Sequence, residues 1–142
     1  MSESCIFCRI VRGEIPSYKV YEDEKTLAFL DINPSAPGHT LIIPKAHECR
    51  VEDLSREDAE ALFRALHGLV AGIQEAMDAS SSSIGINNGP ESGQEVPHVH
   101  IHVIPRRRGD RGGIIQGLVG ATGRPSDEDL RVIAERIMEK VV

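Results

Sequence analysis

The feature that most constrains this fold is a short segment in which three histidines alternate with apolar residues, His98-Val99-His100-Ile101-His102-Val103. Successive side chains of a β-strand point to opposite faces, so the three imidazoles should share one face along about 13 Å of strand. The two valines and the isoleucine then share the opposite face, where they can enter a core. Histidine gains or loses a proton near neutral pH more readily than other side chains. The row therefore predicts a functional site on a strand.

The size and composition of the chain are those of one soluble globular domain. It has 142 residues, of which 40% are hydrophobic and 27% charged, which is enough to bury a core. No apolar run approaches the roughly 20 residues that cross a bilayer, and residues 1–5 lack the features of a secretion signal. We therefore expect a cytoplasmic protein with no membrane partner. A formal net charge of −6 argues against nucleic acid as a general partner.

Hydrophobic periodicity predicts the order of the secondary-structure elements. Besides the histidine segment, alternation and turn residues predict strands at 19–21, 26–30, 39–43 and 83–86. Ser55 can cap a helix, with Asp58 as a weak capping-box partner. Apolar residues then recur at helical spacing, namely Leu62, Phe63, Leu66, Leu69, Val70, Ile73 and Met77. Ser126 opens a second helix. Strands in succession around one inserted helix favour an antiparallel α+β domain over a doubly wound fold.

The histidine row admits three chemical interpretations. Zinc could be held by all three rings, but the outer pair would converge on one ion about 2.0–2.1 Å from each nitrogen only if the strand bent strongly. A neutral imidazole could instead attack phosphorus and form a covalent phosphoramidate. Backbone amides of the loop 89–94 would then stabilise the charge on the phosphoryl oxygens. Incidental surface histidines are the third interpretation, which the regular alternation disfavours.

Two further groups of residues carry weaker signals. The chain has three cysteines, and an odd number without a secretion signal argues against a disulfide framework. Cys5 and Cys8 form a C-x-x-C pair, which alone serves either zinc or redox chemistry. Four arginines follow the histidine segment at 106, 107, 108 and 111. They form either a solvated loop or a region that attracts an anion to the site.

With these features the chain resembles the histidine triad (HIT) superfamily, and in particular its Hint-like bacterial branch. The segments that match are the histidine row, Cys5 to Ile10, Gly13 to Ser17, Phe29 to Ile32, Pro37 to His47, and Asn87 to Gln94. The resemblance covers about 4–108. It implies a five-stranded antiparallel sheet with one long helix and a C-terminal helix, in a homodimer whose sheets join into a continuous larger sheet. Residues 1–142 would be a single domain, with 109–142 as a C-terminal extension that carries a helix.

The resemblance implies a nucleoside phosphoramidase or nucleotidyl hydrolase that acts on a purine nucleotide of the AMP type. By position, His100 is the nucleophile that takes the nucleoside monophosphate, and His102 binds the phosphate and supports departure of the leaving group. Asp31 would accept hydrogen bonds from the ribose hydroxyls, and Phe29 and Ile32 would line the base pocket. The residues that would position the phosphate are Asn87, Gly93 and Gln94. Two alternatives stay open: a dinucleoside polyphosphate hydrolase, and a nucleotide-binding regulatory protein with incidental hydrolysis.

The resemblance also implies a zinc site apart from the chemistry. In zinc-bearing bacterial members the ligands match Cys5, Cys8, His47 and His98. Four protein ligands leave no open position, so this zinc would be structural and would attach the N-terminal segment to the sheet. A metalloenzyme with zinc in the triad itself is the competing interpretation.

A few residues are given no role in the chemistry. Glu95 stands where eukaryotic members have a serine, and a carboxylate beside the leaving group could alter substrate preference. Cys49 is expected to be a bystander thiol. His39 is expected to belong to the packing of its strand, and His67 to a polar edge of the long helix.

Overall fold

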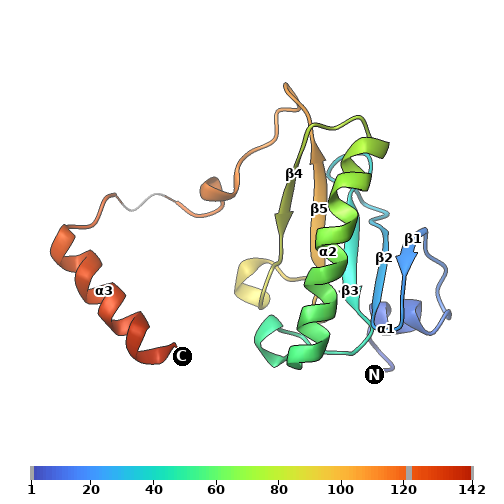
Figure 1. The fold of residues 1–142 in the computed structure, drawn as a ribbon, viewed down its shortest axis with the longest axis horizontal. Coiled ribbons are helices and arrows are strands. Elements are labelled where there is room, and N and C mark those ends of the chain that lie inside the picture. Colours follow the sequence, from blue (N-terminus) through green and yellow to red (C-terminus); the bar gives the residue numbers. More distant parts are fainter. Residues whose placement is uncertain (1, 121–122, 142) are drawn as a thin grey trace. The chain divides into compact units, whose positions relative to one another are not determined.

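The computed structural model describes residues 2–120 and 123–141. Its centre is a five-stranded antiparallel sheet in the order β1-β2-β3-β5-β4 (Figure 1). The strands are β1 (Lys19–Glu22), β2 (Thr26–Leu30), β3 (Thr40–Pro44), β4 (Ser81–Gly85) and β5 (Ile101–Arg106). The helices are α1 (Ile6–Val11), α2 (Arg56–Ala76) and α3 (Asp127–Lys140). The expected α+β class with a five-stranded antiparallel sheet is confirmed; α1 is a helix that the sequence analysis missed.

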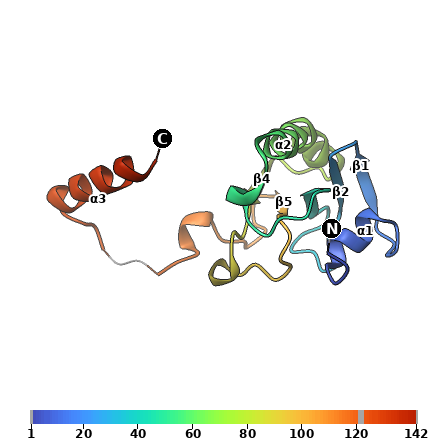
Figure 2. The ribbon, with the colours of Figure 1, turned by 90° about the horizontal axis from the view of Figure 1, so that it is seen from below.

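Alternation along the strands divides the core into two layers, one on each face of the sheet. Leu27 and Phe29 pack with the apolar side of α1 on one face. Ala28 and Ile42 pack with Leu62 of α2 on the other. Figure 2 shows α2 lying along one face of the sheet. The face that carries α1 is the one that matters for the site.

The long helix begins where its capping residue predicts. The Asp58 amide donates to the Ser55 hydroxyl at 3.1 Å, which satisfies one of the free N–H groups of the first turn. Leu62 is fully buried, but Phe63 is 44% exposed, so its assignment to the apolar stripe was wrong. One residue is a rotation of about 100° along a helix, which carries Phe63 to the edge of the stripe centred near Leu62.

The histidine segment has the expected faces, but the strand begins three residues later, at Ile101, and extends to Arg106. Val99, Ile101 and Val103 are buried in the layer beneath α2, and the imidazoles lie on the other face. Strand β5 begins only at Ile101, because the neighbouring strand β3 ends opposite Val99, at Pro44, which has no N–H to donate. The Val99 amide instead donates to the Glu48 carbonyl at 2.8 Å. The chain around His98 is therefore free of the ladder, and its ring is not constrained to the same row as the other two.

Residues 113–142 form a compact unit of their own. Within it α3 begins at the expected cap, since the Asp129 amide donates to the Ser126 hydroxyl at 3.1 Å. Over the described parts of the chain we find no helix with the length and apolar character of a membrane span.

Candidate active site and metal cluster

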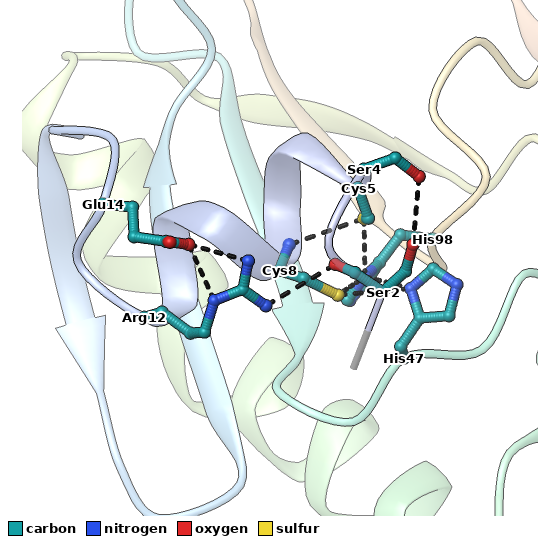
Figure 3. A network of polar contacts seen from close by, with 8 residues as sticks. All are labelled: Ser2, Ser4, Cys5, Cys8, Arg12, Glu14, His47 and His98. Carbon is teal, nitrogen blue, oxygen red and sulfur yellow. Dashed lines mark hydrogen bonds and ion pairs between the residues drawn. The ribbon is translucent and has the colours of Figure 1, made fainter.

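The three histidines of the row face two different groups of side chains. His98 turns toward the N-terminal helix, where its Nδ1 atom lies 3.4 Å from the Cys5 sulfur and 3.6 Å from the Cys8 sulfur. His47, which follows β3, brings its Nδ1 atom to 3.2 Å from the Cys8 sulfur and 3.3 Å from the Nδ1 atom of His98. Figure 3 shows these side chains converging from three separate segments. The structure thus brings together the four residues predicted as zinc ligands.

The spacing of these atoms fits a tetrahedral metal. With metal–nitrogen bonds of about 2.0–2.1 Å and metal–sulfur bonds of about 2.3 Å, two nitrogens lie about 3.3–3.4 Å apart, and a nitrogen and a sulfur about 3.5–3.6 Å apart. The measured separations are 3.3 Å between nitrogens and 3.2–3.6 Å between nitrogen and sulfur. Two thiolates and two imidazoles are the donors that zinc prefers. The residues present therefore fit a closed, four-ligand zinc site.

The backbone prepares His98 as a ligand. Its Nε2 atom lies 2.8 Å from the Pro44 carbonyl oxygen, and a carbonyl only accepts, so the proton of the neutral ring is on Nε2. The lone pair on Nδ1 then faces the thiols and His47. Burial lowers the pKa of His98 to about 4, so the ring is neutral at neutral pH. Burial also raises the pKa of the Cys8 thiol, so a bound cation would be needed to hold it as thiolate at neutral pH.

The N-terminal helix supplies both sulfurs because of its first turn. Cys5 is the N-cap of α1, and its sulfur accepts from the Cys8 amide at 3.4 Å. The C-x-x-C spacing therefore places both sulfurs at one helix end. Arg12 at the other end of α1 donates to Glu14 at 2.7 Å and to the Ser2 carbonyl at 3.5 Å (Figure 3). These contacts fold the residues before α1 back along the helix.

His100 and His102 face a separate cavity of about 430 Å³, within the range of small-molecule sites. Five more of the predicted site residues contribute to its wall, namely Phe29, Asp31, Ile32, Asn87 and Gly93. Gln94 is not among the lining residues. The side-chain oxygen of Gln94 accepts from the Gly89 N–H at 2.9 Å, and its side-chain nitrogen donates to the Cys49 carbonyl at 2.8 Å. These two hydrogen bonds hold the loop that forms the wall.

The orientation of His100 leaves one nitrogen available for chemistry. Its Nδ1 atom lies 2.7 Å from the His98 carbonyl oxygen, so Nδ1 carries the proton and the lone pair is on Nε2. The ring is buried against the edge of Phe7, with 5.1 Å between the ring centres. A neutral imidazole fixed in this way has a nucleophilic nitrogen whose direction is set by the backbone.

His39 belongs to this site, which corrects the expectation that it only packs within its strand. The Ser35 amide donates to Nδ1 of His39 at 3.0 Å, so the proton of that ring is on Nε2. The Nε2 atom lies 2.9 Å from Nδ1 of His102 and therefore donates to it. Strand pairing sets the contact, because Leu41, two residues after His39, lies opposite His102 in the sheet. No local pattern around His39 could have revealed this pairing.

The contact with His39 determines the tautomer of His102. Because Nδ1 of His102 accepts, its proton is on Nε2, a buried atom with no hydrogen-bond partner among the described residues. Burial, and then the nearby His100, lower the pKa of His102 to about 4. The ring is thus a neutral donor. An unpaired buried N–H in a cavity wall would be satisfied by an oxygen of a ligand.

Asp31 and Glu95 bring carboxylates to the same cavity. Asp31 follows β2, and one of its oxygens accepts from the Asn33 amide at 2.9 Å; the other lies 3.7 Å from Nε2 of His39. The four arginines at 106, 107, 108 and 111 are absent from the cavity wall as described. Arg106 pairs with Asp110 at 2.7 Å, and Arg107 donates to the Met77 carbonyl. Arg106 is the last residue of β5, which the loop interpretation did not foresee, whereas the arginines at 107, 108 and 111 follow the strand in a loop.

Comparison with known proteins agrees with the sheet and shows a family. The HIT domain family matches residues 12–109. The protein named Protein hit from Bacillus subtilis (strain 168) is 40% identical over 141 residues, which cover 99% of this chain and 96% of that protein. Adenosine 5'-monophosphoramidase HNT1 of Saccharomyces cerevisiae is 41% identical over 120 residues, 82% of this chain and 71% of the yeast protein. The crystal structure of a HIT family member from Bacillus subtilis superposes with a TM-score of 0.84 at 38% identity and covers 99% of both chains.

These matches define the class of the protein. The chain belongs to the HIT domain family, as its histidine segment suggested. This membership places it among the HIT family hydrolases.

Proposed function

We propose that this protein is a nucleoside 5′-phosphoramidase that acts on purine nucleotides through a nucleotidyl-His100 intermediate. The observation that carries the proposal is the pair of tautomers in the cavity: a lone pair on Nε2 of His100 beside an unpaired N–H on Nε2 of His102. One group is suited to attack phosphorus and the other to donate a hydrogen bond to a phosphoryl oxygen. The 41% identical yeast relative carries the name of an adenosine 5'-monophosphoramidase.

The reaction would proceed in two balanced steps. Nε2 of His100 attacks the phosphorus, a new P–N bond forms, and the P–N bond to the amine breaks. The amine leaves with a proton from a water molecule, the Nε2 N–H of His102 donates a hydrogen bond to a phosphoryl oxygen, and the His98 carbonyl accepts a hydrogen bond from the charged His100 ring. The hydroxide left from that water then attacks the phosphorus, and the His100–P bond breaks to release the nucleoside monophosphate and the neutral His100 ring.

The remaining cavity residues would bind the nucleotide. We assign the ribose hydroxyls to Asp31, whose carboxylate accepts hydrogen bonds, and the base to the apolar walls at Phe29 and Ile32. Asn87 and Gly93 would lie at the phosphate. Gly93 has a φ of 97°, a conformation that other residues rarely adopt, so it lets the loop turn close to a ligand. Gln94 would act indirectly, because its amide holds the loop.

The Cys5, Cys8, His47 and His98 cluster would hold a structural zinc. When bound, the metal would supply a cross-link between α1, the segment after β3 and the segment before β5. The cytoplasm, where thiols stay reduced, is the compartment that this site favours. We further propose a homodimer in which the sheets join. The supporting observation is that β4 is at the edge of the sheet, where unpaired backbone groups can bind another strand.

The proposal is tested by trapping the intermediate. Rapid acid quenching during turnover of adenosine 5′-phosphoramidate, followed by peptide mass spectrometry, should find an adenylyl group on the peptide that contains His100. His100→Ala should lose the adduct and at least about 10³-fold in kcat, with unchanged melting temperature and retained AMP binding. Full activity in that variant would sink the proposal.

The same assay distinguishes an enzyme from a binding protein. A kcat/KM below about 10⁴ M⁻¹s⁻¹ for every phosphoramidate and dinucleoside polyphosphate in a panel would favour a regulatory protein with incidental hydrolysis. Preferential turnover of dinucleoside polyphosphates would reassign the substrate and leave the roles of His100 and His102 unchanged.

A further inference from the structure

Within its own unit, as far as that unit is described, the C-terminal helix α3 leaves an apolar stripe exposed. Its members are spaced by three and four residues, which places them on one side of a helix, and they are Leu130, Ile133, Ala134 and Ile137. The three large side chains are 44%, 46% and 56% exposed. Isolated helices of fewer than about 12–15 residues are marginal in water, and α3 has 14. It therefore needs a surface against which the stripe can be buried.

The charged residues of α3 differ between its two sides. On the side away from the stripe, Arg131 pairs with Glu128 at 2.6 Å and with Glu135 at 3.1 Å. Beside the stripe lie three other charged residues, Asp129, Arg136 and Lys140, at helical spacings of seven and four. None of these three has an ion pair with a residue of the same unit in the ranges 113–120 and 123–141. Their charges are arranged with the acid at the start of the helix and the bases at its end.

We propose that α3 packs antiparallel against α3 of a second copy of this chain. Reversing one helix about a point between Ile133 and Ala134 sets Leu130 opposite the partner's Ile137. Equivalent flanks face each other in an antiparallel pair, so Asp129 lies beside the partner's Arg136 and Lys140, and the same contacts form again by symmetry. Antiparallel helix dipoles also attract, whereas a parallel pair would align them and place like charges level.

The pair would be a modest interface. A helix of 14 residues is about 21 Å long, so the stripe alone buries less than a standard stable interface. Ile114, Ile115, Leu118 and Val119 of the same unit are 56–81% exposed and offer further apolar area. This inference rests on α3 and does not depend on the joining of the sheets.

Cysteine cross-linking tests the pairing and its direction in the full-length chain. In a Cys49→Ser background, which removes the exposed thiol, Leu130→Cys mixed with Ile137→Cys should give a disulfide-linked dimer under mild oxidation. Either variant alone should link at least about tenfold more slowly. Preferential linking of Leu130→Cys to itself would indicate a parallel pair and overturn the proposal. Absence of cross-links in the mixture would also overturn it, even if light scattering showed a dimer formed by the sheets alone.

Charge reversal and hydrogen exchange give an independent test. Arg136→Glu with Lys140→Glu should weaken pairing about tenfold, and mixing that variant with Asp129→Lys should restore it. Glu139→Lys on the far side is the matched control and should change pairing less than twofold. Exchange of the α3 amides should slow as protein concentration rises. Concentration-independent protection would show that the stripe is covered by its own chain, which contradicts the proposal.

Discussion

Two clusters of side chains that could bind a metal lie on the α1 face of the sheet, and they differ in the protons that their histidines carry. One consists of Cys5, Cys8, His47 and His98, and the other of Asp31, His39 and His102. In both clusters the ligand atoms lie within 4.8 Å of one another. Residue types and distances alone would therefore nominate both as cation sites. They differ in the backbone groups that bind the rings.

In the first cluster, a backbone carbonyl accepts a hydrogen bond from the ring nitrogen of His98 that points away from the cluster. In the second cluster, a backbone amide donates a hydrogen bond to the corresponding nitrogen of His39. The Pro44 carbonyl accepts a hydrogen bond from Nε2 of His98, so the proton is on Nε2 and the lone pair on Nδ1 faces the cluster. The Ser35 amide occupies the lone pair of His39, so a proton faces His102. A metal on Nε2 of His39 would have to displace that proton and leave the ring with no N–H. The first cluster thus presents a lone pair that suits a cation, and in the second a proton lies between the two rings.

The largest expected effect comes from removing a ligand of the first cluster. Cys8→Ser should lose the bound zinc and lower the melting temperature by about 10 °C, because the metal stabilises only the folded state. Cys49→Ser, which changes an exposed thiol, is the control and should shift it by less than about 2 °C. Elemental analysis and thermal unfolding measure both.

The number of zinc ions bound per chain directly tests the proposed difference between the two clusters. We expect one zinc per chain. A second tightly bound zinc that disappears in Asp31→Asn would show that the second cluster also holds a cation.

The next effect concerns the proton held by the second cluster. His39→Leu should lower kcat about tenfold to a hundredfold, because His102 loses the donor that fixes its tautomer. His39→Gln should recover much of the loss, since its amide N–H can donate to Nδ1 of His102. Steady-state kinetics and melting temperatures of both variants provide the measurement. Equal losses in the two variants would indicate a packing role only.

A smaller effect is expected in the pH dependence of stability. The pKa of His102 is about 4 in the folded protein, against 6.5 for an ordinary histidine. Between these values the unfolded chain binds more protons, so stability falls as pH falls through 6.5 toward 4. His102→Gln should remove about 1–2 kcal/mol of the loss between pH 7.5 and pH 5. Urea unfolding of both proteins with bound zinc measures this, and identical pH profiles would contradict it.

The smallest effect is expected at the rim of the cavity. Glu95 is exposed and lines the cavity, so its carboxylate should favour amine leaving groups that carry a positive charge. Glu95→Gln should reduce the preference for a cationic over a neutral leaving group about twofold to fivefold. The ratio of the two kcat/KM values, measured at low and high salt, tests this. A ratio that is unchanged by the mutation would assign Glu95 to the loop alone.

Much of this site could be predicted from the sequence because its signals are local. Period-two alternation indicated the faces of the histidine segment, and the caps Ser55 and Ser126 located two helices. The contacts that set the chemistry are not local. The partner of His102 is His39, which is 63 residues away, and strand pairing brings them together. The start of β5 at Ile101 likewise depends on where Pro44 falls in the neighbouring strand.

The sequence by itself determined which side chains are available, on which face of a strand they lie, and which family the chain resembles. Only the tertiary structure decided which ring nitrogen of each of the three histidines carries the proton and which groups each ring faces. A neutral imidazole has one proton and two nitrogens, and the group behind the ring selects between them. For His98 and His100 that group is a carbonyl, at Pro44 and at His98; for His102 it is His39. The fold places these hydrogen-bond partners beside the rings, and they cannot be predicted from the alternation of residues.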